Sequence, residues 1–265
     1  MTGPTPFAPV SSGPNRPGSI HTVVVVVPVR NEEALLPRCL DALTAAIDAL
    51  GNVPETERPK VSVLLVLDRC TDRSARIAAV WKNFDQCEIR AGAVGVARRD
   101  GVRQALGSLR GSSPPSNLAS DRIWIATTDA DSAVPPNWLA TQLALARNGA
   151  ELVLGTVHPD DEILGQELLR WQSLQVLEEG HCHVHGANLG VRADRYLEAG
   201  EFAPVDRDED VLLVGALRAL GVAEARTALI PVLTSGRRVG RTPAGFAGYL
   251  RENVDVDQRN EPAVR

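Results

Sequence analysis

The chain has 265 residues, of which 44% are hydrophobic and 23% charged, a usage typical of a globular domain that buries a sizeable core. Its formal net charge of −5 leaves no basic excess to neutralise a phosphate backbone, which argues against nucleic acid as a partner. No apolar run reaches the roughly 20 residues that a transmembrane helix needs, and the four cysteines lack metal-type spacing, so we expect free thiols in a reducing, cytoplasmic compartment.

The N-terminal part of the chain predicts a tail, a strand and a helix. Residues 1–20 are rich in Pro, Gly and Ser and lack the apolar core of a secretory signal, so we expect a disordered tail. Five consecutive valines at 23–27 predict a buried strand that Pro28 ends. Apolar residues then recur at helical spacing from Leu35 to Leu50.

The strand-and-helix unit repeats, which implies a mainly parallel sheet covered by helices on both faces. The next predicted elements are a strand at 61–67, a helix from a cap at Thr71 or Asp72 to Trp81, a strand at 87–91, a helix at 94–106, a loop at 107–120 and a strand at 123–126. Beyond these we expect a helix from Pro135 to Asn148, a strand at 151–157, a helix at 162–179, an extended segment at 183–192, a helix at 208–220, a strand at 228–233 and a helix at 242–253.

Two carboxylates, Asp129 and Asp131, follow the apolar run at 123–126. Such neighbours repel each other unless a cation lies between them or water solvates them. Hard oxygen ligands suit Mg²⁺ or Mn²⁺, and such an ion would hold a diphosphate. A solvated acidic turn at a strand end is the alternative.

Three polar segments follow predicted parallel strands: PVRNEE from Pro28, LDRCTD from Leu67 and TTDAD from Thr127. The carboxyl ends of parallel strands meet at one edge of a sheet, where ligands bind. We therefore expect these segments to share one site.

This order of segments resembles the family 2 glycosyltransferases, whose GT-A fold binds a nucleotide-sugar across the strand ends. The resemblance runs from about Val23 to Leu220 and is also carried by GVARRDG, HGANLGVRADRYLEAGEF and the acidic motif at 208–210. It implies a single α/β domain with a mostly parallel, Rossmann-like sheet sandwiched by helices. Its parts would be a nucleotide-sugar-binding half at 21–157, a smaller acceptor-side half at 158–255 and a frayed tail at 256–265.

The resemblance also implies roles for single residues. The base and ribose would be lined by Pro28, Val29 and Arg30, whose loop Glu32 would fix; Asp68 would accept a hydrogen bond from the base imide, and Arg98 would approach the base or diphosphate. Asp129 would contact ribose or metal, and Asp131 would ligate the metal. The catalytic base would be Asp210, which Glu209 precedes.

The chain departs from the family pattern at two places. The family commonly has two acids after the second strand, whereas Asp68 is followed by Arg69-Cys70-Thr71, so either Asp68 alone reads the base or the pocket prefers another nucleotide. Where many members have Arg-Asn, this chain has Arg98-Arg99, and we expect a ligand role for Arg98 and a solvated helix face for Arg99.

Arg237 and Arg238 follow the last predicted strand in a glycine-containing loop. Their planar guanidinium groups match phosphate oxygens, so they could close over the diphosphate, or they could form an exposed basic loop. We count both among the candidate donor-binding residues.

His183, His185 and Asn188 belong to a segment that resembles the acceptor-facing strand of the family, so we expect them on the acceptor side. With His181, the two histidines share one face of an extended segment, a pattern that could also bind Zn²⁺. Packing between sheet and helix is a further reading for His181.

The resulting hypothesis is a metal-dependent, inverting, non-processive glycosyltransferase that uses a nucleotide-diphosphate sugar, with UDP favoured. QELLRW at 166–171 departs by one residue from the signature of processive synthases and precedes the acidic motif rather than following it. The alternatives are a sugar nucleotidyltransferase and a catalytically silent binding module. The expected partners are the donor and a small-molecule, lipid or glycan acceptor; a lipid acceptor would place the protein at the membrane surface, and a homodimer is left open.

Overall fold

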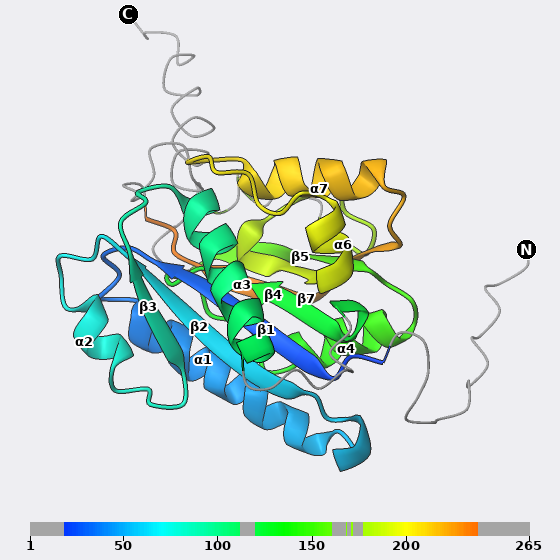
Figure 1. The fold of residues 1–265 in the computed structure, drawn as a ribbon, viewed down its shortest axis with the longest axis horizontal. Coiled ribbons are helices and arrows are strands. Elements are labelled where there is room, and N and C mark those ends of the chain that lie inside the picture. Colours follow the sequence, from blue (N-terminus) through cyan, green and yellow to red (C-terminus); the bar gives the residue numbers. More distant parts are fainter. Residues whose placement is uncertain (1–18, 112–119, 161–167, 169–170, 172–176, 238–265) are drawn as a thin grey trace, which may run out of the picture.

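The computed structural model describes residues 19–111, 120–160, 168, 171 and 177–237. These residues form a seven-stranded sheet with the order β3-β2-β1-β4-β6-β5-β7 (Figure 1). The strands are β1 Thr22–Val29, β2 Lys60–Asp68, β3 Asp85–Ile89, β4 Ile123–Thr127, β5 Leu152–Pro159, β6 Leu189–Arg192 and β7 Glu224–Thr234. Within this sheet β6 runs antiparallel to both of its neighbours, and all other neighbouring strands are parallel.

Helices cover both faces of the sheet (Figure 1). The helices are α1 Leu36–Asp48, α2 Ser74–Ala78, α3 Val94–Gly111, α4 Trp138–Arg147, α6 Ala193–Glu198 and α7 Glu209–Ala219, with 3₁₀ turns at η1 Ala49–Asn52, η2 Glu55–Glu57, η3 Ser120–Arg122 and η4 Gly186–Asn188. Alternate side chains of a strand point to opposite faces. Val23, Val25 and Val27 of β1 therefore pack with α1 and α4 in one core, while Val24 and Val26 pack with α3 and α7 in the other. The mostly parallel, sandwiched α/β sheet predicted from the sequence is confirmed.

Several predicted boundaries were wrong. Pro28 does not end β1, because the strand pairs in register with β2 through Val29. The predicted loop at 107–120 begins inside α3, where the Ser108 hydroxyl donates to the Gln104 carbonyl one turn back and Leu109 packs against the core. The structure ends α2 at Ala78, three residues before Trp81, and begins β7 at Glu224.

The segment predicted as extended at 183–192 is broken by the η4 turn, and only its last part forms a strand, β6. Helix α6 follows at once and was not predicted. Ile20, assigned to the tail, is 8% exposed and belongs to the core. The helix predicted at 162–179 lies largely outside the described residues, as do the helix at 242–253, Arg238, the tail at 256–265 and residues 1–18.

The fold brings the carboxyl ends of β1, β2 and β4 to one edge of the sheet, because these strands are adjacent and parallel. Among the described residues, no helix has the length and apolar character to cross a bilayer.

Candidate active site

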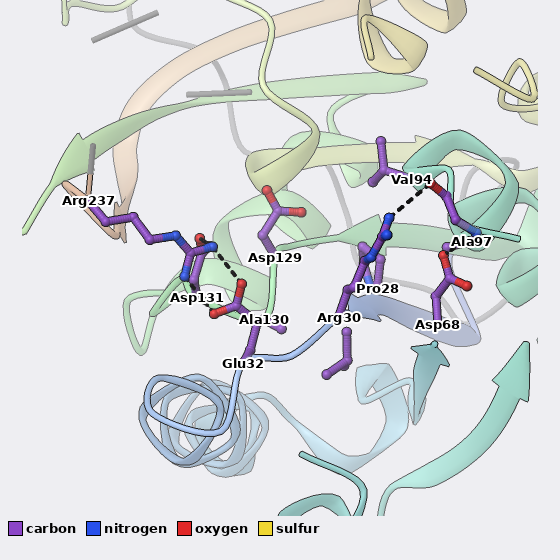
Figure 2. Close-up of a pocket in the computed structure, with 12 residues that line it drawn as sticks. Pro28, Arg30, Glu32, Asp68, Val94, Ala97, Asp129, Ala130, Asp131 and Arg237 are labelled. Carbon is purple, nitrogen blue, oxygen red and sulfur yellow. Dashed lines mark hydrogen bonds and ion pairs between the residues drawn. The ribbon is translucent and has the colours of Figure 1, made fainter. Parts of the chain in front are cut away.

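A pocket lies at the carboxyl ends of β1, β2 and β4 (Figure 2). Eight residues predicted to bind the donor or a metal line it together: Pro28, Val29, Arg30, Glu32, Asp68, Asp129, Asp131 and Arg237. Gly92, Val94, Ala97 and Ala130 complete the lining. Segments more than 200 residues apart in the chain thus meet at one site, as Figure 2 shows for Glu32 and Arg237.

Asp68 is the last residue of β2 and is 3% exposed. Its Oδ2 accepts a hydrogen bond from the Gly92 amide at 2.7 Å, while its buried Oδ1 has no partner among the described residues. The Gly92 carbonyl in turn accepts from Arg30 Nη1 at 3.0 Å. A buried carboxylate oxygen without a partner is unfavourable, so an N–H group of a ligand in the pocket would stabilise this arrangement.

Gly92 was missed by sequence reasoning. It has a positive φ of 77°, and a Cβ there would lie 2.7 Å from the Arg69 guanidinium. Only glycine fits this position without strain. A glycine directly after a predicted strand was the available sequence indication.

The loops after β1 and β2 are tied to each other by hydrogen bonds. Asn31 adopts a positive φ of 55°, and its side-chain oxygen accepts from the Thr71 amide at 2.7 Å. The Glu32 amide donates to the Ser74 hydroxyl at 2.8 Å. These bonds position Glu32, which is 6% exposed, near the loop after β4 that carries Asp129 and Asp131, which we call the acidic loop.

The carboxylate of Asp131 is repelled by the charge of Asp129 and attracted by that of Arg237. Its Oδ2 lies 2.9 Å from Arg237 Nη2, and the Ser132 hydroxyl donates to Oδ1 at 3.1 Å. The same guanidinium makes two hydrogen bonds to Glu32, of 2.6 and 2.5 Å (Figure 2). Burial, followed by the charge of Asp129, raises the pKa of Asp131 to about 7, although Arg237 acts in the opposite direction. Additional positive charge would therefore stabilise the ionised site.

The acidic loop offers two protein carboxylates for a divalent ion. Within the described part of the chain, no group of three or more His, Cys, Asp or Glu side chains could hold a metal. Mg²⁺ is usually bound by one or two carboxylates, with waters and substrate phosphates as its other ligands. Asp129 and Asp131 fit that kind of site, and the raised pKa of Asp131 fits a carboxylate that a cation would complement.

The segment after β7 contributes Arg237 to the pocket, and hydrogen bonds join it and the end of β7 to other parts of the site. Ala133 and Leu233 exchange backbone hydrogen bonds of 2.7 and 3.0 Å. Asp160 accepts from the Gly236 amide at 2.9 Å and pairs with Arg38 at 2.8 Å, and Arg38 also donates to the Asp131 carbonyl at 2.8 Å. Arg38 and Asp160 therefore position the segment that carries Arg237.

The predicted catalytic base, Asp210, is not among the residues that line the pocket. It stands in the first turn of α7, and its Oδ2 accepts from the Gly186 amide at 2.6 Å. Glu209 is 4% exposed and forms an ion pair with Arg98. Arg98 also pairs with Asp129 and is 3% exposed, so it connects the loop after β4 to the start of α7 and is not among the residues that line the pocket.

The three histidines form a stack. The ring centroids of His181 and His183 lie 5.8 Å apart, as do those of His183 and His185, with nearly parallel planes. Burial, assisted by the other two rings, lowers the pKa of His185 to about 4, and burial lowers the pKa of His181. Because no metal-holding group is found among the described residues, the zinc alternative is not supported there.

Asn188 does not present its amide to an acceptor. It is 1% exposed, its Oδ1 accepts from Trp138 Nε1 at 2.8 Å, and its Nδ2 donates to the carbonyls of Thr156 and Ile230 at 2.8 and 2.7 Å. The side chain joins α4, β5 and β7. Its predicted acceptor-side place is corrected to a structural one, because all three neighbours are internal.

Comparison with known proteins gives a consistent result. The model of the family described as Glycosyl transferase family 2 matches residues 24–185, more than half of the chain. A curated relative, the undecaprenyl-phosphate 4-deoxy-4-formamido-L-arabinose transferase of Pseudomonas paraeruginosa (strain DSM 24068 / PA7), is 27% identical over 227 residues. That match covers 83% of this chain and 56% of the relative, so the chain spans just over half the length of that protein.

Solved structures with a similar fold include the following two. S. aureus TarS 1–349 in complex with UDP-GlcNAc matches with a TM-score of 0.58 and 16% identity, over 92% of this chain and 68% of that one. The mannosyltransferase PcManGT from Pyrobaculum calidifontis, in complex with GDP-Man and Mn²⁺, matches with a TM-score of 0.56 and 17% identity, over 96% and 68%. These likenesses support the expected GT-A type fold. Together with the family match they lead to one conclusion: this chain belongs to glycosyl transferase family 2.

Proposed function

We propose that the protein transfers a sugar from a nucleoside-diphosphate sugar, with UDP favoured, to a hydroxyl group of an acceptor. The reaction would require Mg²⁺ or Mn²⁺, invert the anomeric centre and add one sugar without processivity. The main support is that Asp68, Asp129 and Asp131 line one pocket, and that Asp210 is held by the amide of Gly186, which packs against Arg98, the ion-pair partner of Asp129.

The donor's base would lie against the Asp68 side of the pocket. The unpartnered Oδ1 of Asp68 would accept a hydrogen bond from the imide of uracil. Pro28 and Val29 would supply apolar contact, and Arg30 would border the ribose. Guanine offers a similar N–H donor, so GDP is the competing nucleotide.

The diphosphate would lie against Asp131 and Arg237, at the other end of the lining (Figure 2). Asp129 and Asp131 would hold the divalent ion, which supplies charge neutralisation for the departing diphosphate. The planar guanidinium of Arg237 suits phosphate oxygens and would give a second positive contact.

Asp210 would take the proton of the acceptor hydroxyl. The Gly186 amide fixes one carboxylate oxygen at 2.6 Å, and the adjacent Val211 amide donates to the other at 2.8 Å. The base stands on a different segment from the acidic loop, so it can act on the side of the sugar away from the leaving group. That arrangement favours inversion.

The acceptor is proposed by class only. The curated relative is named for an undecaprenyl-phosphate substrate, so a lipid-linked acceptor that carries a hydroxyl group, reached from a cytoplasmic, membrane-peripheral position, is our working choice. A nucleotidyltransferase is less well supported, because PVRNEE replaces the glycine-rich loop that such enzymes commonly have after the first strand. The paired and oriented Asp131 and Asp210 argue against a silent binding module.

A thermal-shift panel of UDP, GDP, CDP and dTDP, each with and without Mn²⁺, tests the donor class. A ligand at about 100 times its Kd stabilises the folded state by about 2.7 kcal/mol, which is a readily measured shift. We expect UDP to give the largest shift, and only with Mn²⁺. A shift that ignores the ion, or none with any nucleotide, would contradict the proposal.

Asp210→Asn tests the base. We expect UDP–Mn²⁺ binding to persist while transfer falls by roughly 10²–10⁴-fold, the usual contribution of a general base. Asp208→Asn is the matched control, because its side chain is 67% exposed and asparagine tolerates the positive φ at that position. Loss of nucleotide binding in Asp210→Asn would remove Asp210 from the base role.

A further inference from the structure

Arg98 is a buried cation shared between the two sides of the site. It lies in the first turns of α3 and is 3% exposed. Nη2 pairs with Asp129 Oδ1 in the loop after β4, and Nη1 pairs with Glu209 Oε1 at the start of α7. The two terminal nitrogens of the guanidinium therefore each pair with a carboxylate from a different segment. Arg98 is thus not among the pocket-lining residues, although the family resemblance implied that it would approach the base or diphosphate.

A third segment packs against the same group. A Cβ at Gly186 would lie 2.5 Å from Arg98 Nη1 and 2.6 Å from its Cζ, so the η4 turn approaches the guanidinium with its bare backbone. The Gly186 amide is the donor that holds Asp210 Oδ2. Its carbonyl accepts from the Thr127 hydroxyl, at the end of β4, at 2.7 Å.

The surrounding backbone leaves Arg98 little freedom. A Cβ at Gly95, one turn earlier in α3, would meet the Ala203 carbonyl at 2.1 Å, and the Gly95 amide donates to the Val205 carbonyl at 3.0 Å. The Phe202 ring lies below the guanidinium, with its centroid 5.9 Å from Cζ. Helix α3 is thereby docked on the loop that leads into α7.

The burial of Glu209 makes its ion pair with Arg98 important for stability. Glu209 is 4% exposed, and a buried carboxylate deprived of its cation is strongly unfavourable. A planar guanidinium can serve two carboxylates at once with fixed geometry, which a single ammonium group cannot reproduce. Arg98 is thus fitted to set the distance between the acidic loop and the start of α7.

We propose that Arg98 is a positioning residue that couples the donor-side Asp129 to the base Asp210, through Glu209 on one side and the Gly186 turn on the other. The inference rests on the proposed function and deepens it. Arg98 touches neither donor nor acceptor. It aligns the base with the anomeric carbon, and it occupies only Oδ1 of Asp129, which leaves Oδ2 of that carboxylate for the ion.

Three variants separate this role from simple charge balance. Arg98→Met removes the cation and keeps an unbranched apolar side chain in place of the arginine stem. Arg98→Met/Glu209→Gln also removes the buried charge of Glu209 that the first change leaves unpaired. Arg98→Lys keeps the positive charge but lacks the planar guanidinium. Each is compared with the parent by metal-free Tm, by calorimetric Kd for UDP–Mn²⁺, and by kcat and KM for hydrolysis of UDP-GlcNAc or GDP-Man, whichever the parent turns over faster.

We expect Arg98→Met to lower Tm and the added Glu209→Gln to restore most of it, because the two residues form one ion pair. The Kd for UDP–Mn²⁺ should change little. The kcat should fall about 10²-fold in Arg98→Met, the scale of a 1 Å misplacement, and should stay low in the double variant and in Arg98→Lys.

Recovery of kcat together with Tm in the double variant would overturn the proposal, since charge balance would then suffice. A Kd that weakens as much as kcat falls, with Arg98→Lys near the parent, would make Arg98 a donor ligand instead. Failure of the parent to bind any nucleoside diphosphate would refute the proposed function itself. In that case the Tm comparison would still decide whether Arg98 and Glu209 are coupled, because it needs no donor.

Discussion

Asp131→Asn should make the metal-free protein more stable while removing its response to the ion. Burial and the neighbouring Asp129 raise the pKa of Asp131 to about 7, from an ordinary value of 3.8. An acid whose folded pKa is raised costs stability when it ionises. The parent should therefore lose stability as pH rises from about 4 to 7, and the loss should persist above pH 7.

The magnitude follows from that shift. A difference of about 3 pKa units at about 1.36 kcal/mol each gives an upper limit near 4 kcal/mol at pH 8. The side chain of Asp131 retains 19% of its surface, so solvent screens part of this cost. About 2 kcal/mol then remains, which corresponds to roughly 4–8 °C in Tm for a domain of this size.

The assay is thermal unfolding in a chelator between pH 5 and 8, repeated with Mn²⁺. Asp131→Asn should unfold at higher temperature than the parent at pH 8, the difference should shrink toward pH 5, and added Mn²⁺ should shift the parent alone. Asp41→Asn removes an exposed carboxylate from α1 and serves as the control with no change. A variant less stable than the parent at every pH would show that the Arg237 ion pair outweighs burial and repulsion, and would refute this reasoning.

Three further predictions concern other parts of the site. Asp68→Asn should weaken UDP–Mn²⁺ binding at least about tenfold, because a hydrogen bond to a charged group contributes about 1.5–3 kcal/mol; unchanged calorimetric affinity would exclude Asp68 as a base contact. Asn188→Leu should cost at least about 3 kcal/mol in urea unfolding, because it orphans three buried partners at about 1–3 kcal/mol each, and a cost below about 1 kcal/mol would contradict its structural role. His185→Phe should remove an acid sensitivity: its pKa of about 4 lies below the ordinary 6.5, so the parent loses up to about 3 kcal/mol as pH falls from 6.5 toward 4. The pH dependence from His185 is opposite in sign to that from Asp131, so the free energy of unfolding of His185→Phe is compared with that of the parent at pH 7.5 and at pH 5. An equal difference at both pH values would contradict the prediction for His185.

The sequence predicted the parallel part of the sheet well, because continuous apolar runs such as the five valines of β1 are typical of strands buried on both faces. It could not give the direction of β6. That four-residue strand takes its orientation from pairing with Thr127 and Leu154, which lie far away in the chain. Asn188 directly precedes β6, and an asparagine in a sequence gives no indication that its side chain will be buried and will hydrogen-bond to three buried groups.

At the site, residue types at strand ends were predictable, and side-chain partners were not. Arg38 and Asp160 are separated by 122 positions, and each alone reads as a solvated surface residue. Arg98 stood on the correct helix, but its orientation depends on Gly186 and Glu209, which approach from other segments. Gly186, the first glycine of HGANLG, was a local indication that another group approaches the backbone closely there.

The strand order also bears on how the chain folds. β1, near the middle of the sheet, pairs with β2 about 40 positions later and with β4 about 100 positions later, while β7 closes the sheet against β5. Such long-range closures are slow, and during synthesis they wait for distant segments to leave the ribosome. Arg237 would be among the last parts of the described chain to emerge, so the part of the pocket that Arg237 lines would be completed late.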